Sequence, residues 1–519
     1  MHADCEVGGC QRGPGQYHER VTALDSHRNW NGQAGKELLT RTKRIPTRKV
    51  TATVSSSSAT FVSQLMDSIR QFFARPMVAL RGPYWMLAAL AMMFVAAAVS
   101  RHDGVTSVYD EITYLDWVLS LPGNAIAQTG EPFSLQGREL FACQGVMYFG
   151  TTGPPCGSDY SNLLEFPQQG ISTADAYTPL FFWPVWAFAK VVTLFGPDLV
   201  YGARLAMMMW LVPTVLVMFA VMRRMRVHDG ISMATIALFI SSPFAWWSYT
   251  YLSTDASVPL IGALALLIAV RFLQDAGSLW WLVPLAVVGQ LLKVTSFLGI
   301  LLPVIALALV WGAQLFVRKT GKSFASQSGG ERTLTFSDWF LPALTSGIAL
   351  AATQLGWTYV RQMLAVGEPP NQWLTLPRGM TGEMLFQSIN FLWMGVVARP
   401  MQSYGNATWN VPTTYGMLLT FLVIAGVIGM LLSRPASTTE FGLAWATGIA
   451  AVTFGPLLFG VLLVLAEPFS MPGRYGAALL PAFFLMVALA VRWPGGRLLL
   501  VGASVPATAY ALLRGLNYA

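Results

Sequence analysis

VTSFLGILLPVIALALVWGAQLF, residues 294–316, is a run of 23 residues without a charged side chain. An α-helix rises about 1.5 Å per residue, so this run can cross a hydrocarbon layer about 30 Å thick. That layer contains no water, and backbone polar groups must therefore pair within the segment, as they do in a helix. The stretch predicts a transmembrane helix.

Ten further apolar segments flank this one. By residue number they are 84–100, 204–222, 231–247, 256–272, 279–292, 339–359, 415–432, 441–465, 475–491 and 498–513. The 519-residue chain is 54% hydrophobic and 11% charged, with a mean hydropathy of +0.52, whereas soluble domains are about 25% charged. We predict an all-α polytopic membrane protein with about eleven transmembrane helices.

Lys and Arg residues are unevenly divided between the two sides of these spans. Short loops on one side hold basic clusters, such as those beginning at Arg223 and Arg318. Two long stretches on the other side, about 101–203 and 361–414, hold few. Basic residues concentrate on the cytosolic side of a membrane. We therefore expect a cytosolic N-terminus and two large outer loops.

The segment YTPLFFWPVWAFAKVVTL, residues 177–194, allows two interpretations. It is apolar enough to be a further span, but this would place the basic cluster at Arg223 outside, against the charge rule. Its two prolines, its lysine and its many aromatic residues favour a juxtamembrane helix lying in the interface.

The N-terminal segment is different in composition. Residues 1 to about 65 are polar and basic and contain SSSSAT at 55–60, so we predict a disordered cytosolic segment, 1–80, before a transmembrane domain, 81–519. A translation start at Met66 is an equal alternative. The net charge of +8 lies mainly here and at helix ends, which indicates membrane orientation, not nucleic-acid binding. The chain has no P-loop, so we expect no ATP-driven activity.

The four cysteines form two pairs in the sequence, one in the polar N-terminal segment and one in the first large loop. Cys143 and Cys156 could form a disulfide if that loop is outside the cytosol, and it would close a loop of about 14 residues, worth ~3 kcal/mol in the entropic model. Two free thiols are an equal alternative.

Three acidic residues are candidates for chemistry. Asp110 and Glu111 follow the first span, and Asp255 precedes the span 256–272. Ionisable groups at a membrane surface are candidate functional sites, and a carboxylate can act as a general base or a metal ligand. Each acid also has a structural alternative, because acidic residues cap helices and favour the helix dipole.

Two cations are expected at the same face. Lys293 lies between two spans at the outer edge of the hydrocarbon layer, where snorkelling is the alternative interpretation. Arg474 heads a helix, where a cation opposes the dipole. A guanidinium at headgroup depth is suited to bidentate phosphate recognition. We therefore predict that both residues bind phosphate.

Several short motifs occur in a characteristic order. They are the acidic pair Asp110-Glu111, the element YTPLFF (177–182), ARL (203–205), TDA (254–256), LLKVTSF (291–297) and GRYGAALLP (473–481). In this order they resemble the GT-C superfamily of integral-membrane glycosyltransferases, most closely its bacterial and actinobacterial branch. One motif departs from the pattern, since many relatives have Pro-Pro-Leu where this chain has Thr-Pro-Leu.

The resemblance implies a function and roles for the candidate residues. The protein would be a hexosyl- or pentosyltransferase of the bacterial inner membrane. On the outer face it would move a sugar from a polyprenyl-phosphate donor to a glycan, lipid or protein acceptor. Asp110 or Glu111 would match the catalytic acid of the first loop, Asp255 that of the second, and Lys293 and Arg474 the cations facing the donor phosphate.

Some relatives use a divalent cation, Mg²⁺ or Mn²⁺, for which Asp110, Glu111 and Asp255 would be the ligands. Aromatic residues of the outer loops could stack on sugars or anchor in the interface. They are Tyr114, Trp117, Trp183, Trp186, Trp373 and Trp409. The alternative functions are a transporter or flippase of a lipid-linked precursor and a non-catalytic membrane assembly protein. Internal repeats, which are usual in transporters, do not occur between the two halves.

Overall fold

The computed structural model describes residues 82–102, 104–108, 110–321, 332–369, 388–389, 395–396, 411–465, 473–491 and 494–515. The predicted disordered segment 1–80 and most of the second outer loop, with Trp373 and Trp409, lie outside these ranges. The described residues form helices and contain three isolated β-bridges but no strand. The all-α class is confirmed.

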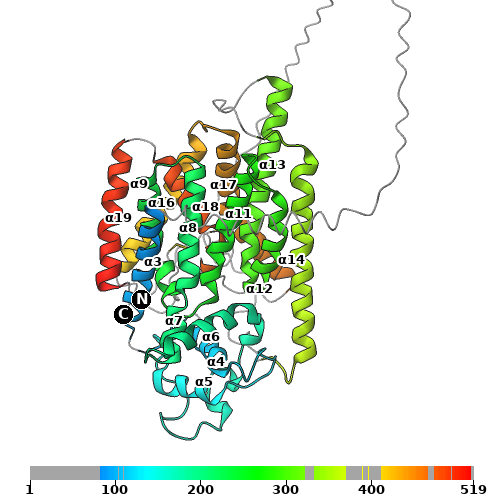
Figure 1. Ribbon diagram of the computed structural model, residues 1–519. Coiled ribbons are helices and arrows are strands. Elements are labelled where there is room, and N and C mark those ends of the chain that lie inside the picture. Colours follow the sequence, from blue (N-terminus) through cyan, green and yellow to red (C-terminus); the bar gives the residue numbers. More distant parts are fainter. Residues whose placement is uncertain are drawn as a thin grey trace, which may run out of the picture. The chain divides into compact units, whose positions relative to one another are not determined.

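The helices are shown in Figure 1. The α-helices are α3 (Pro83–Val99), α4 (Glu111–Ser120), α5 (Leu135–Glu139), α6 (Pro179–Thr193), α7 (Leu199–Leu205), α8 (Met208–Arg224), α9 (Asp229–Ile240), α10 (Pro243–Tyr249), α11 (Val258–Leu273), α12 (Leu282–Leu292), α13 (Phe297–Thr320), α14 (Phe336–Leu364), α16 (Val411–Leu432), α17 (Thr438–Leu465), α18 (Leu480–Ala490) and α19 (Pro494–Arg514). The short 3₁₀ or π helices are η1 (Leu140–Gln144), η2 (Leu163–Glu165), η3 (Pro167–Gly170), η4 (Ala174–Ala176), η5 (Thr254–Ser257), η6 (Leu279–Trp281), η7 (Val294–Ser296) and η9 (Gly473–Leu479).

The described helices identify a multi-pass membrane protein. Seven helical stretches are long and apolar enough to cross a bilayer, and the bent pair α9–α10 could form an eighth. Three other predicted spans coincide with shorter or less apolar helices, namely α3, the pair η6–α12, and α14. The predicted total of about eleven transmembrane helices therefore stays a prediction.

The predicted span 231–247 is broken in the structure. It consists of α9 and α10, which meet at an angle of 62°. Pro243 occupies the first turn of α10, and the Ser242 hydroxyl accepts a hydrogen bond from the Ala245 amide. A proline and a capping serine begin a new helix, and this explains the break that hydropathy alone did not reveal.

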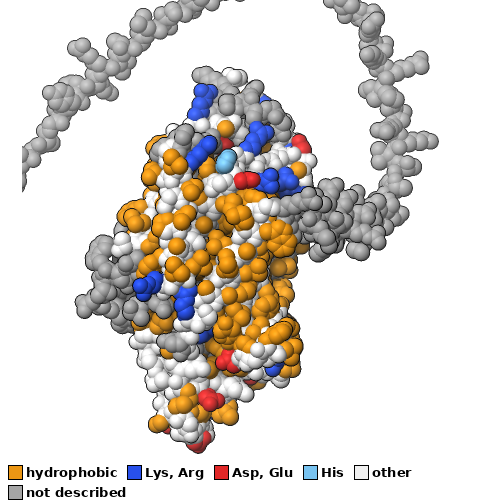
Figure 2. Space-filling model, turned by 60° about the vertical axis from the view of Figure 1, so that its left-hand side comes forward, with side chains coloured by type: hydrophobic (Ala, Val, Ile, Leu, Met, Phe, Trp, Pro, Cys, Tyr) orange, Lys and Arg blue, Asp and Glu red, His pale blue; other side chains and the backbone are white. Residues whose placement is uncertain are grey.

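Three long helices connect two chemically different ends of the molecule. α8, α11 and α13 each begin near the first-loop helices, and each has basic residues in its last turn. The basic ends of α8 and α11 lie together, because Arg224 and Gln274 exchange hydrogen bonds of 3.3 and 3.0 Å. Figure 2 shows a broad hydrophobic band on one face, with charged side chains concentrated above and below it. This arrangement is typical of a membrane protein.

The first large loop folds into a compact layer at the other end (Figure 1). It contains α4, α5 and α6, and α6 packs against α4 and α7. This position agrees with the predicted juxtamembrane helix. Leu194 and Phe195, just after α6, are exposed. Cys143 and Cys156 form a disulfide, so the structure favours that alternative over two free thiols.

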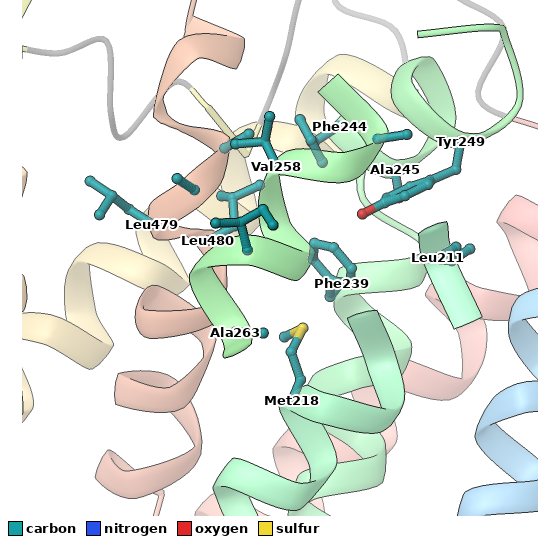
Figure 3. Packing of buried hydrophobic residues seen from close by; sticks show 14 of the residues in the cluster. Leu211, Met218, Phe239, Phe244, Ala245, Tyr249, Val258, Ala263, Leu479 and Leu480 are labelled. Atoms are coloured by element: carbon teal, nitrogen blue, oxygen red, sulfur yellow. The ribbon is translucent and has the colours of Figure 1, made fainter. Parts of the chain in front are cut away.

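A close approach of α11, α13 and η9 positions the elements of the site. A Cβ atom on Gly262 would lie 1.9 Å from the Ala478 carbonyl oxygen, and one on Gly299 would lie 2.8 Å from the Gly262 Cα. Small residues allow such approaches between membrane helices. Figure 3 shows the apolar core beside this contact, where α8, α9 and α11 meet Leu479 and Leu480.

Candidate functional site

The two acids of the first loop point into different surroundings. Asp110 precedes α4 with a left-handed backbone (φ 61°), a conformation that Asp tolerates better than most residues. Its side chain is 45% exposed. Glu111 is the first residue of α4, and its side chain is 0% exposed. The two adjacent side chains therefore lie in different environments.

Glu111 is held by four donors. The Arg204 Nε and Nη2 atoms donate to its two carboxylate oxygens at 2.9 and 3.1 Å. The backbone amides of Ser107 and Leu252 donate at 2.7 and 2.9 Å. We call Glu111 and Arg204 the anchor pair. It joins α4, α7 and the turn before η5, and this geometry favours a structural role over the base or metal-ligand roles expected for Glu111.

The other four predicted residues form one ionic cluster, which we define as Asp110, Asp255, Lys293 and Arg474. Lys293 Nζ lies 2.6 Å from Asp255 Oδ1. Arg474 Nη2 lies 2.9 Å from Asp110 Oδ2, and Arg474 Nε lies 3.4 Å from Asp255 Oδ2. Residues up to 364 positions apart in the chain thus meet at one end of the bundle. The hypothesis requires this proximity, but the roles of the residues stay predictions.

Each member of the ionic cluster is placed by a break or turn between helices. Asp255 lies in η5, where its amide donates to the capping hydroxyl of Ser253 at 3.2 Å. Lys293 separates α12 from η7 and has an extended backbone. Arg474 lies in η9. These interruptions bring polar backbone and ionic side chains to a protein-lined site, where a membrane protein can accommodate them.

A hydrogen-bonded chain leads from Lys293 into the first loop. Lys293 Nζ donates to Thr254 Oγ1 at 3.1 Å, and the Thr254 hydroxyl donates to Tyr114 Oη at 3.2 Å. The Tyr114 hydroxyl then donates to Tyr177 Oη at 2.8 Å. The rings of Tyr177 and Tyr475 lie 5.7 and 6.0 Å from Lys293 Nζ, within the range of cation–π attraction.

The two loop tyrosines remain neutral donors. Burial raises the pKa of Tyr114 well above its ordinary value, and the nearby Tyr177 and Asp110 reinforce the effect. Burial and the neighbouring Asp110 also raise the pKa of Tyr177. Both hydroxyls thus remain protonated throughout the physiological range. Because Tyr114 donates its proton to Tyr177, the Tyr177 hydroxyl is the one that can donate a hydrogen bond to an anionic ligand.

Sequence reasoning missed the roles of Arg204 and Thr254. Arg204 appeared only as part of the ARL motif, although an arginine inside an apolar segment signals a buried partner. Thr254 appeared only as part of the TDA motif. Among the aromatic candidates, Tyr114 and Trp117 are buried and belong to the core of the first loop. Trp183 and Trp186 contact each other on α6.

The expected metal ligands do not form a set. Within the described residues, no group of three or more His, Cys, Asp or Glu side chains is arranged to hold a metal ion. Glu111 is bound by Arg204 in the anchor pair, while Asp110 and Asp255 both contact Arg474. These residues do not fit the expected three-carboxylate site, and we derive no step through a metal.

No family model matches the chain, and a search of curated proteins finds no match. Among solved structures, the chain resembles the crystal structure of ArnT from Cupriavidus metallidurans in the apo state, with 14% sequence identity and a TM-score of 0.38. The match covers 74% of this chain and 60% of that one.

Proposed function

We propose that this protein is a membrane glycosyltransferase of the GT-C type that moves a sugar from a polyprenyl-phosphate donor to a glycan, lipid or protein acceptor of the cell envelope. In this proposal the reaction takes place at the ionic cluster, on the outer face of a bacterial inner membrane. The observation that carries the proposal is the contact between Arg474 and the half-exposed Asp110 beside the buried Asp255–Lys293 pair.

Asp110 is the proposed general base. Its carboxylate is accessible, whereas those of Glu111 and Asp255 are buried and paired. Asp110 accepts the proton of the acceptor hydroxyl as the hydroxyl oxygen attacks the anomeric carbon. The new glycosidic bond forms, the bond between the sugar and the phosphate oxygen breaks, and polyprenyl phosphate leaves with the electron pair.

Arg474 and Lys293 are the proposed phosphate-binding residues. The phosphate gains negative charge as it leaves, so a cation already in place stabilises the transition state more than the ground state. In the free protein Asp110 occupies one edge of the Arg474 guanidinium. A donor phosphate that replaces Asp110 at this edge also releases the carboxylate to act as a base. Binding of the donor and activation of the acceptor are thereby coupled.

Asp255 is proposed to position both cations. Its two carboxylate oxygens contact Lys293 and Arg474 separately, and its side chain is almost completely buried. A carboxylate held this way fixes the spacing of the two cations. The anchor pair in turn fixes the start of α4, and with it Asp110.

The proposal is tested with purified protein and a polyprenyl-phosphate sugar donor. We expect Asp110→Asn to lower the transfer rate by about 10²- to 10⁴-fold, the usual contribution of a general base, while the melting temperature stays close to that of the wild type. Asp159→Asn, an exposed acid in the same loop, is the matched control. Full transfer by Asp110→Asn overturns the assignment of the base.

The same preparation separates the alternative functions. In vesicles, a flippase moves the lipid-linked precursor without forming a glycosidic bond, and this movement does not require Asp110 as a base. A non-catalytic assembly protein gives neither movement nor transfer. Product formation that depends on Asp110 excludes both alternatives.

A further inference from the structure

A second polar site lies at the basic end of the bundle. Arg223 and Arg224 in the last turn of α8 and Arg271 in the last turn of α11 line a cavity of about 330 Å³. The other lining residues are Tyr84, Ala220 and Leu267. Because α8 and α11 begin near the ionic cluster and end here, the two sites are separated by the length of these helices.

The cavity has an excess of positive charge. Arg223 lies 3.4 Å from Asp229, and both side chains are about half exposed. Arg224 donates to the Gln274 side-chain oxygen at 3.3 Å, and Arg271 donates to the Ala276 carbonyl at 3.1 Å. Within the described part of the chain, three guanidinium groups therefore share one carboxylate. An anion in the cavity would relieve this repulsion.

The cavity is also amphipathic. Ala220 precedes Arg223 and Arg224 by three and four residues, and Leu267 precedes Arg271 by four, so each apolar residue lies one turn from its arginine on the same helix face. The wall of the cavity is therefore apolar toward the membrane and cationic toward its rim. A ligand with a phosphate and an attached hydrocarbon chain matches both parts.

General membrane rules explain only part of this arrangement. Basic residues at these positions satisfy the cytosolic charge rule and the C-terminal helix dipoles. Neither rule requires three arginines from two helices to converge on one cavity with a tyrosine and an apolar wall. Basic pockets between transmembrane helices are suited to anionic lipid headgroups. We propose that this cavity binds the headgroup of an anionic phospholipid from the adjacent leaflet.

The experiment measures phospholipid binding to the full-length protein in detergent by native mass spectrometry, with phosphatidylglycerol and phosphatidylcholine as probes. We expect a clear preference for phosphatidylglycerol. Arg224→Gln/Arg271→Gln should weaken its binding by at least about tenfold, given the usual energy of a basic residue near an anionic lipid. Arg318→Gln/Lys319→Gln, in the last turn of α13, is the control with equal charge loss and should retain the preference.

Two further measurements decide the source of the anion and the need for the cavity. Inorganic phosphate that competes at equal concentration would show a site for free phosphate and overturn the lipid assignment. Ala220→Phe keeps every charge but fills the apolar wall, and it should also weaken phosphatidylglycerol binding. Unchanged binding in this variant, or equal loss in the α13 control, would show a general attraction to basic ends and overturn the proposal.

Discussion

The anchor pair and the ionic cluster both contain an ion pair between an acid and an arginine, but the two acids differ in exposure. In the anchor pair, Glu111 and Arg204 are both buried, and four donors occupy the carboxylate. In the ionic cluster, Asp110 is half exposed and its carboxylate has an accessible edge. Both acids pair with an arginine, and they are neighbours in the sequence. An ion pair with arginine therefore does not distinguish a structural acid from a candidate reactive acid. The distinguishing property is whether hydrogen-bond donors occupy the whole carboxylate.

Breaking the anchor pair should have the largest effect. Glu111→Ala leaves the Arg204 charge buried without its partner, and we expect the free energy of unfolding to fall by about 3–5 kcal/mol. Thermal unfolding in detergent measures the change. The double variant Glu111→Ala/Arg204→Met should recover part of the loss, and Glu165→Ala, an exposed acid of the same loop, should be nearly neutral. A wild-type melting temperature for Glu111→Ala contradicts the structural role.

Arg474→Lys tests the ionic cluster through its effect on the rate of sugar transfer. A lysine keeps the charge but lacks the planar fork that reaches Asp110 and Asp255 together. We expect the transfer rate to fall about 100-fold, the usual loss when one transition-state donor is removed, with a small change in melting temperature. Arg434→Lys, at an exposed position, should have no effect. An unchanged rate for Arg474→Lys removes the arginine from the proposed mechanism.

A change in the packing of η9 against α11 should also disturb the ionic cluster. Gly262→Ala places a methyl group against the Ala478 carbonyl and should displace η9, which holds Arg474. We expect a loss of stability of about 1–3 kcal/mol, typical of overpacking, together with lower activity. Gly312→Ala on α13, where nothing lies within 4 Å of the new atom, is the control. Equal behaviour of the two variants would exclude a tight contact at Gly262.

The second acid on α4, Asp116, should give the smallest effect. Asp116 is buried and accepts two hydrogen bonds from Ser134, and its burial raises its pKa to about 6. The folded state then holds a proton more strongly than the unfolded state, so stability rises as the pH falls from about 6 toward 3.8. Between pH 7 and 5 the gain should be about 1 kcal/mol.

Asp116→Asn should remove this gain. Subtracting the change in stability of the variant between the two pH values from that of the wild type cancels the contributions of all other titratable groups. Melting temperatures of both proteins at pH 7 and pH 5 measure the effect. Parallel shifts in the two proteins would mean that the pKa of Asp116 is close to its ordinary value.

The sequence predicted the helices and the gathering of charges because both follow from hydropathy. Lys293 and Arg474 lie at the ends of apolar runs, and the alternation of successive spans across the membrane places these ends on the same side. The different exposures of the Asp110 and Glu111 side chains could not be predicted, since they depend on the left-handed backbone of Asp110 at the start of α4. The partner of Glu111 could not be predicted either, because Arg204 reaches it only after α7 has folded against α4.

Local signals were present where the prediction of the fold was incomplete. Ser242-Pro243 marks the break between α9 and α10, although the run is apolar on both sides. The pairing of Cys143 with Cys156 requires the loop to bring them together, and spacing alone left it open. The series of hydrogen bonds from Lys293 to Tyr177 joins four separate segments of the chain and has no linear sequence signature.

The ionic cluster contains two acids and two cations, so its formal charges sum to zero. Such a quadrupole creates little field beyond its own dimensions, and a distant phosphate is not attracted to it. In the proposed reaction, the isoprenoid tail would deliver the donor by lateral diffusion in the bilayer, and charge recognition would begin only at contact. Turnover should therefore be nearly independent of ionic strength, in contrast to enzymes that collect soluble anions by electrostatic steering.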